Sequence, residues 1–85
     1  LEDLRVAGVK LLLVIYVLTV EAGREGITMY DAVAEAGIAP STFSTYIRVL
    51  EARNLIEKWV GERRTYVKLT ERGRRIAELL LKLAD

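Results

Sequence analysis

Stripes and runs of apolar residues divide the chain into four helical segments and one hairpin. The first segment, about residues 4–21, is apolar on nearly every face, so a helix there must be buried on more than one side. Two shorter segments, about 29–36 and 41–53, repeat apolar residues at i, i+3, i+4 and i+7, which indicates amphipathic helices. The last segment, about 71–84, carries a leucine-rich stripe with the same spacing.

Two runs rich in β-branched and aromatic residues within residues 55–69 predict a β-hairpin. They flank Gly61-Glu62-Arg63-Arg64, which we interpret as a four-residue loop. Ile27 is predicted to form a very short strand. The order helix, short strand, helix, helix, strand, strand, helix predicts a mainly α fold with a small β-hairpin. This α+β plan is that of a winged helix-turn-helix, in one domain over residues 1–85.

Capping residues mark the predicted helix ends. Thr28 with Asp31 three residues later resembles a capping box, although Asp replaces the usual Glu or Gln. Gly37 and Asn54 can take the left-handed conformation that ends a helix. Thr70 is placed to cap the last helix.

Composition restricts the chemistry available to the chain. Apolar residues make up 52% and charged residues 29%, which is typical of a folded globular protein. There is no cysteine and no histidine, which excludes disulfides, thiolate or imidazole metal sites and Ser-His or Cys-His catalysis. No convergent carboxylate pair or phosphate-cradling glycine loop stands out. We therefore expect no enzyme activity, no cofactor and no metal.

Two features argue against a secreted or membrane protein. The chain opens with acidic residues where a signal peptide needs positive charge. The longest uncharged run, Leu11 to Val20, is about half of the ~20 residues that cross a bilayer. We expect a cytoplasmic protein that becomes nucleoid-associated when it binds DNA.

Charge is distributed unevenly along the chain, although the net charge is only +1. Residues 1–47 hold three basic and six acidic residues, a balance of −3, and residues 48–85 hold ten basic and six acidic, a balance of +4. The second half is therefore a candidate electropositive surface for double-stranded DNA. Near-neutral overall charge argues mildly against an architectural DNA-binding protein of low specificity.

The second helix of a helix-turn-helix commonly lies in the major groove, with the wing on the backbone or in the minor groove. On this basis the candidate DNA-binding residues are Ser41, Thr42, Ser44, Thr45 and Arg48 on the helix, Lys58, Arg63, Arg64 and Lys68 on the hairpin, and Arg72 after it. The alternative is a solvated helix face and a hairpin edge protected by charge. Positive charge at residues 72–75 opposes the dipole of the last helix, which favours a use in phosphate contact.

The first and last helices carry more apolar residues than one small core can bury. We expect the apolar residues that remain outside the core to be buried between two copies of the chain in a homodimer, in which two recognition helices would lie about 34 Å apart. The candidate interface residues are Leu4, Leu11, Ile15, Leu18, Leu79, Leu80 and Leu83. A partner subunit, or another portion of the same protein, is the alternative occupant.

The segment from Pro40 through Glu57, with Ser41-Thr42-Phe43-Ser44-Thr45-Tyr46-Ile47-Arg48 at its start, resembles the recognition-helix region of prokaryotic winged-helix regulators. Tyr66-Val67-Lys68-Leu69-Thr70-Glu71-Arg72-Gly73 is similar to the "strand, Leu-Thr-x-x-Gly, helix" ending of their wings. The MarR-like, ArsR-like and PadR-like families share this pair of motifs, which spans about residues 28–76. The pair indicates the superfamily and does not choose among its members.

The resemblance implies a homodimeric, sequence-specific DNA-binding transcription regulator of archaeal or bacterial type. It assigns groove contacts to Thr42, Ser44, Thr45 and Arg48 and wing contacts to Arg63 and Arg64. Asn54 stands where those families usually have Gly, and Ala39 where a Ser or Thr cap is frequent. The missing cysteine and histidine exclude an ArsR-type metal sensor built from this chain. A winged-helix module used for protein interaction remains the alternative function.

Overall fold

The computed structural model describes residues 5–84. Its elements in chain order are α1 (Arg5–Tyr16), the π-helical turn η1 (Val17–Glu21), α2 (Met29–Ala36), α3 (Pro40–Ala52), β1 (Ile56–Gly61), β2 (Arg64–Leu69) and α4 (Glu71–Ala84). Ile27 pairs with Val67 as a single bridge, so the short strand predicted before the second helix is present. The predicted fold class, a mainly helical winged helix-turn-helix with one antiparallel hairpin, is confirmed.

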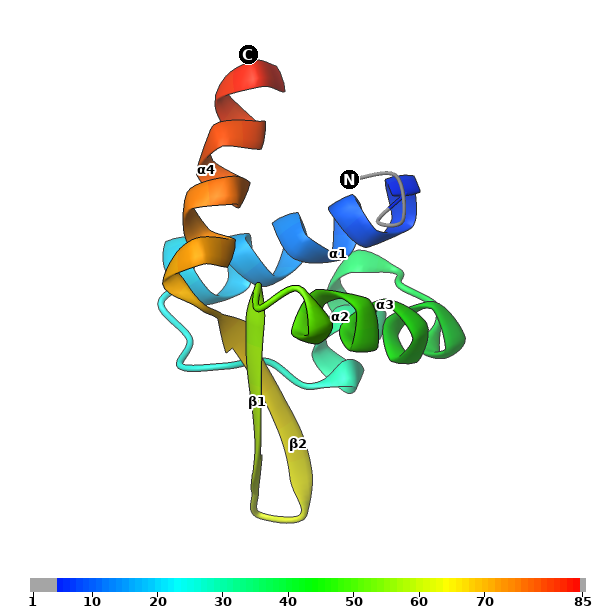
Figure 1. The fold of residues 1–85 in the computed structure, drawn as a ribbon. Helices are drawn as coiled ribbons and strands as arrows, with labels where there is room; N and C mark the ends of the chain where they lie inside the picture. Colours follow the sequence, from blue (N-terminus) through cyan, green and yellow to red (C-terminus); the bar gives the residue numbers. More distant parts are fainter. Residues whose placement is uncertain (1–4, 85) are drawn as a thin grey trace.

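The helix α1 crosses the middle of the molecule, with α4 on one side of it and the α2–α3 pair on the other (Figure 1). The hairpin projects in one direction, and the C-terminal half of α4 projects in the opposite one. The buried core side chains come from the four α-helices, both strands and the loops between them, with Leu11, Leu12 and Ile15 of α1 fully buried. None of the helices in this 5–84 stretch has the length and apolar character to cross a bilayer.

The first helix reaches Glu21 as predicted, but it changes form on the way. After Tyr16 the chain continues as a π-helix over Val17–Glu21, where Thr19 donates a hydrogen bond from Oγ1 to the Ile15 carbonyl at 2.6 Å. Such back-bonding gives the carbonyl a second donor and commonly bends a helix. Leu4 lies outside the described residues.

The wing turn is tighter than the predicted four-residue loop. Gly61 pairs with Arg64 in the strand register, so only Glu62 and Arg63 connect the strands. Both have positive φ, 47° and 69°, as a type I′ turn requires. The right-handed twist of the hairpin strands favours a type I′ turn. The sequence did not indicate one, because the turn residues are Glu62-Arg63 where Asn-Gly is usual.

The predicted caps are present. The Thr28 hydroxyl accepts from the Asp31 amide at 3.2 Å, and the Asp31 carboxylate accepts from the Thr28 amide at 2.9 Å, which completes the capping box. Gly37 ends α2 at φ 66°, and Asn54 follows α3 at φ 60°. The helix α3 begins at Pro40, one residue earlier than predicted, after Ala39, which provides no side-chain cap.

One compact joint connects the end of α3, the hairpin and the start of α4. The Thr70 hydroxyl donates to the Asn54 carbonyl at 2.7 Å and accepts from the Gly73 amide at 3.0 Å. The Thr70 amide donates to the Leu55 carbonyl at 3.0 Å. Gly73 lies so close to Leu55 that a Cβ there would overlap the Leu55 carbonyl oxygen. The Thr-x-x-Gly spacing therefore allows α4 to start directly against β1.

Candidate nucleic-acid interface

The helix α3 has a polar outer face because its apolar residues are used in the core. Phe43, Ile47 and Leu50 are buried along one stripe. On the rest of the helix Ser41, Ser44, Thr45 and Arg48 are exposed and Thr42 is half-buried. The helix-turn-helix thus presents short hydroxyl side chains and one arginine to solvent.

A cleft of about 520 Å³ lies between the start of α2, the face of α3 and the hairpin. Ser44 and Arg48 enter it from α3, and Lys58, Arg64 and Thr65 enter it from the hairpin. The other lining residues are Thr28, Met29, Tyr30, Phe43, Ile47 and Val67. The lining holds three cationic side chains and no carboxylate, so the cleft favours an anion.

The cations of the described chain differ in whether they carry an ion pair. Among residues 5–84, Arg48, Arg63 and Arg64 carry no ion pair. The paired cations are Arg24 with Glu35 at 2.6 Å, Arg74 with Glu78 at 3.3 Å, Arg75 with Glu71 at 2.8 Å and Lys58 with Glu51 at 3.2 Å. Of the described arginine side chains without an ion pair, Arg48 lies on α3, Arg63 and Arg64 lie at the wing turn, and Arg72 lies at the start of α4.

The two faces of the hairpin differ in what they carry. Lys58 is opposite the buried Val67 in the register, which puts it on the face toward α3. Lys68 is on the other face, with its Nζ 5.7 Å from the centre of the Trp59 ring. Trp59 and Tyr66 form a cross-strand pair, stacked at 5.7 Å between ring centres.

The structure brings together only part of the predicted DNA-binding set. Ser44, Arg48, Lys58 and Arg64 meet at the cleft, whereas Ser41, Thr42 and Thr45 lie elsewhere on α3 and Arg63 lies at the wing tip. Lys68 does not line the cleft, and its contact with DNA stays a prediction. Arg72 is exposed at the start of α4 and does not line the cleft.

Three residues that the sequence reasoning missed also line the cleft. Thr65 comes from β2, and Met29 and Tyr30 come from the first turn of α2, where Tyr30 is 70% exposed. The position of Met29 and Tyr30 in the sequence could have indicated this, because the first helix of a helix-turn-helix crosses the DNA backbone beside the recognition helix.

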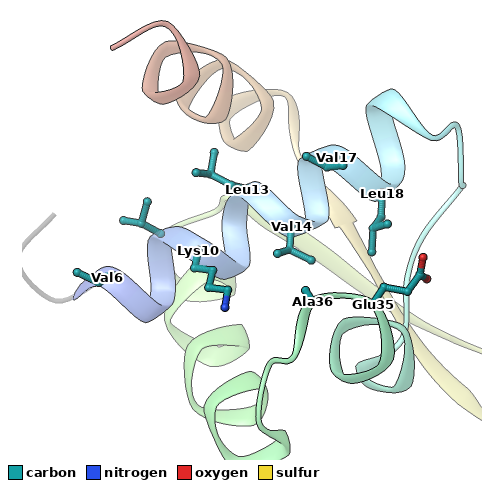
Figure 2. A pocket seen from close by; sticks show the side chains of 9 residues that line it. Val6, Lys10, Leu13, Val14, Val17, Leu18, Glu35 and Ala36 are labelled. Carbon is teal, nitrogen blue, oxygen red and sulfur yellow. The ribbon is translucent and has the colours of Figure 1, made fainter. Parts of the chain in front are cut away.

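A second surface, on α1, is apolar. A groove of about 760 Å³ is lined by residues of α1, η1 and the end of α2, and Lys10 and Glu35 are its charged members. Figure 2 shows Leu13 pointing up toward α4 while Val14 and Leu18 point down toward Ala36 and Glu35. The other lining residues are Val6, Val9 and Val17. We call this surface the α1 groove.

The end of α4 exposes a second set of apolar side chains. Leu79 is 57% exposed and Leu83, one turn later, is 76% exposed. Leu80 and Leu18 are half-buried. Two of the predicted interface residues are corrections: Leu11 and Ile15 are 0% exposed, because α1 turns them into the protomer's own core. The apolar surplus of α1 lies on the groove instead.

A hydrogen-bonded cluster ties α1 to α4. The Tyr16 hydroxyl donates to Glu78 Oε2 at 3.0 Å, and Arg74 Nε donates to the same oxygen at 3.3 Å. The bond to Glu78 raises the pKa of Tyr16, with burial of the phenol adding to the effect. The bonds from Tyr16 and then Arg74 lower the pKa of Glu78 below its ordinary 4.5. Across the described residues no three carboxylates gather as a possible metal site.

Comparisons with solved structures place the fold among winged-helix proteins. AF1382 from Archaeoglobus fulgidus matches with a TM-score of 0.79 at 19% identity, over 91% of this chain and 82% of that one. A mutant of Staphylococcus aureus MepR, bound to an oligodeoxyribonucleotide, matches with a TM-score of 0.74 at 25% identity, over 91% of this chain and 56% of that one. NMB1585, a MarR family regulator from Neisseria meningitidis, matches with a TM-score of 0.66 at 28% identity, over 88% of this chain and 53% of that one.

The chain thus spans just over half the length of the two regulators. No protein-family model matches the sequence, and no curated protein matches it either.

Proposed function

From its place in the winged helix-turn-helix regulator superfamily, we propose that this protein is a transcription regulator that binds specific double-stranded DNA as a homodimer. The helix α3 enters the major groove, and the wing follows the backbone into the adjacent minor groove. The observation that carries the proposal is the position of the unpaired arginines. Arg48 and Arg64 line a carboxylate-free cleft and Arg63 lies in the wing turn next to Arg64, while carboxylates pair with Arg24, Arg74 and Arg75 elsewhere in the described chain.

Each part of this surface suits a different part of a duplex. The hydroxyls of Ser41, Ser44 and Thr45 are short enough to let the backbone of α3 approach base edges and phosphates. Arg48 can form a bidentate contact with guanine or bind a phosphate. Arg63, at the turn, is placed to enter a narrow minor groove, where the potential is most negative.

A second copy of the chain is the occupant that we assign to the α1 groove. Leu79 and Leu83 lie one turn apart on the protruding end of α4, so they form a single ridge. The α1 groove offers the complementary apolar depression of about 760 Å³. With two-fold symmetry the ridge of each protomer lies in the groove of its partner, and both apolar surfaces are removed from water together. The MepR complex with DNA supports the nucleic-acid part of the proposal, and not this interface.

The deciding experiment measures duplex binding by fluorescence anisotropy across salt concentrations. A random duplex of about 25 base pairs is compared for the wild type, Arg48→Ala and Arg63→Ala/Arg64→Ala. We expect the wild type to weaken steeply with salt, and each lost phosphate contact to reduce the log–log slope by about 0.9. Arg24→Ala is the matched control, because Glu35 already pairs with this arginine and it lies outside the candidate DNA-binding set.

Absence of wild-type binding at low salt would overturn the proposal and favour the protein-interaction module.

If the wild type binds, selection of duplexes from a random pool tests the sequence specificity. We expect an enriched site with two-fold symmetry, and recovery of unrelated sequences would favour an architectural role instead.

A further inference from the structure

One carboxylate lies next to the proposed DNA cleft and pairs with one of its cations. Ser44, Arg48 and Glu51 follow one another at i, i+4 and i+7, so they share one row along α3. Ser44 and Arg48 line the cleft, and Glu51 continues the row just beyond it. Its Oε1 lies 3.2 Å from the Nζ of Lys58, which lines the cleft from β1.

This ion pair contributes little to the fold. Both side chains are partly open to solvent, Lys58 at 39% and Glu51 at 44% of their full exposure, and exposed pairs of this kind stabilise a protein weakly. Glu51 is also next to the last residue of α3, where a negative charge opposes the helix dipole. Neither helix stability nor packing explains a glutamate here.

The position is explained if the carboxylate stands in for a phosphate. We propose that Glu51 is a built-in competitor of DNA: it holds Lys58 in the free protein and releases it to a backbone phosphate when a duplex enters the cleft. The inference rests on the DNA-binding function proposed above. Glu51 is thus a positioning residue that acts through Lys58, and it lowers affinity for every duplex, whatever its sequence.

A DNA phosphate can replace the Glu51 carboxylate as the partner of Lys58. A carboxylate and a phosphate both present anionic oxygens to the lysine ammonium, and Lys58 can pair fully with only one of them at a time. Arg48 and Arg64 have no such competitor among the described residues, so they are available to the first phosphate that arrives. Binding then has two stages: a weak first complex held by the arginines alone, and a complete complex in which Lys58 also binds a phosphate.

The test is a double-mutant cycle on duplex binding. The proteins are the wild type, Glu51→Gln, Lys58→Gln and the double variant, each checked for folding by circular dichroism. Anisotropy on a 25-base-pair duplex is measured across salt concentrations. We expect Glu51→Gln to bind about two- to fivefold more tightly at low salt, the range that an exposed ion pair supplies. Lys58→Gln should bind less tightly and reduce the salt slope by about 0.9.

The coupling between the two positions is decisive. In the Lys58→Gln background, Glu51→Gln should leave the affinity nearly unchanged. Glu57→Gln is the matched control, because it removes the same charge from the neighbouring position on the opposite face of β1; it should give a smaller gain than Glu51→Gln.

Two results would overturn the inference about Glu51 alone. One is a wild type that binds while Glu51→Gln binds no more tightly. The other is an equal gain with Lys58 absent, which would make Glu51 a general repulsive charge. If the wild type does not bind DNA at any salt concentration, the proposed function fails and this inference fails with it.

Discussion

The face built by α3 and the wing differs from the surfaces of α1 and α4 in the kind of group that it leaves without a partner. On the first, Arg48, Arg63 and Arg64 have no carboxylate although glutamates are available elsewhere in the chain. On the second, Leu79 and Leu83 of α4 remain exposed to water. Each surface therefore has unused interaction capacity of a single type.

This difference matches the two proposed tasks, DNA binding and self-association. Apolar surface favours association that is insensitive to salt, whereas unpaired cations favour a polyanion and lose affinity as salt rises. The hairpin and the C-terminal half of α4 project in opposite directions (Figure 1), so the proposed contacts with a duplex and with a second copy would use different ends of the molecule.

The largest effect is expected from charging the exposed ridge of α4. Leu79→Glu/Leu83→Glu should weaken self-association by about 100-fold or more, because burying each leucine contributes about 1.5–3 kcal/mol. Sedimentation velocity over a range of concentrations measures this directly. The fold should persist, since both side chains are exposed in the protomer. A wild type that stays monomeric at high concentration would contradict the assigned partner.

The next largest effect is expected at the joint between the surfaces. Gly73→Ala should lower the free energy of unfolding by about 3 kcal/mol, because its Cβ would meet the Leu55 carbonyl, which is backbone and cannot rotate away. Gly61→Ala is the control: its Cβ would lie 3.4 Å from the Tyr66 ring, an ordinary contact. Chemical denaturation compares the two. Similar losses at both positions would show that close approach is not what Gly73 provides.

A smaller effect of opposite sign is expected at the wing tip. Glu62→Asn/Arg63→Gly should stabilise the protein by about 1 kcal/mol, because these residues relieve the cost of two positive φ angles. The same variant should bind DNA less tightly, since it removes Arg63. Glu62→Asn alone retains the arginine and should not lose affinity. Thermal melting and anisotropy on the same samples separate the two effects, and unchanged binding by the double variant would exclude Arg63 from the interface.

The smallest effect concerns the pH dependence of the contact between α1 and α4. The depressed pKa of Glu78 means that the folded state holds its proton less tightly than the unfolded state, so the contribution is present above about pH 4.5. It is lost as the pH falls through the depressed pKa. Melting temperature measured from pH 7 to pH 3 should fall less steeply for Glu78→Gln than for the wild type. Parallel curves would show that the carboxylate does not contribute.

The comparison also explains which parts of the molecule were predictable from sequence. The face of α3 was predictable because its apolar and polar residues alternate at helical spacing, which fixes the phase of the helix. The helix α1 has no such contrast. With apolar residues at nearly every position, Leu11 and Ile15 could not be distinguished from Leu13 and Val17, and only packing against α3, β2 and α4 decides which are buried.

Interactions between distant segments were the other limit. The pairing of Glu51 with Lys58, and the turning of Lys68 away from α3, depend on strand register and on how the hairpin docks. The two-residue wing turn was missed because Glu-Arg is an unusual sequence for a type I′ turn. Local caps, by contrast, depend on residues three or four apart, and Thr28 with Asp31 was identified correctly.

The joint around Thr70 sets a rule for the DNA as well as for the protein. Thr70 hydrogen-bonds directly to Asn54 and Leu55, so the start of α4 is fixed against the end of α3. The helix α3 is proposed to read bases and α4 to pair protomers, and no flexible linker lies at this contact between them. In the proposed dimer, the two recognition helices would then be held at a fixed separation and a fixed rotation about the DNA axis. Inserting about five base pairs between half-sites turns one of them to the opposite side of the duplex. A protein with a flexible hinge could follow that rotation, but this one could reach only the half-site that it already held.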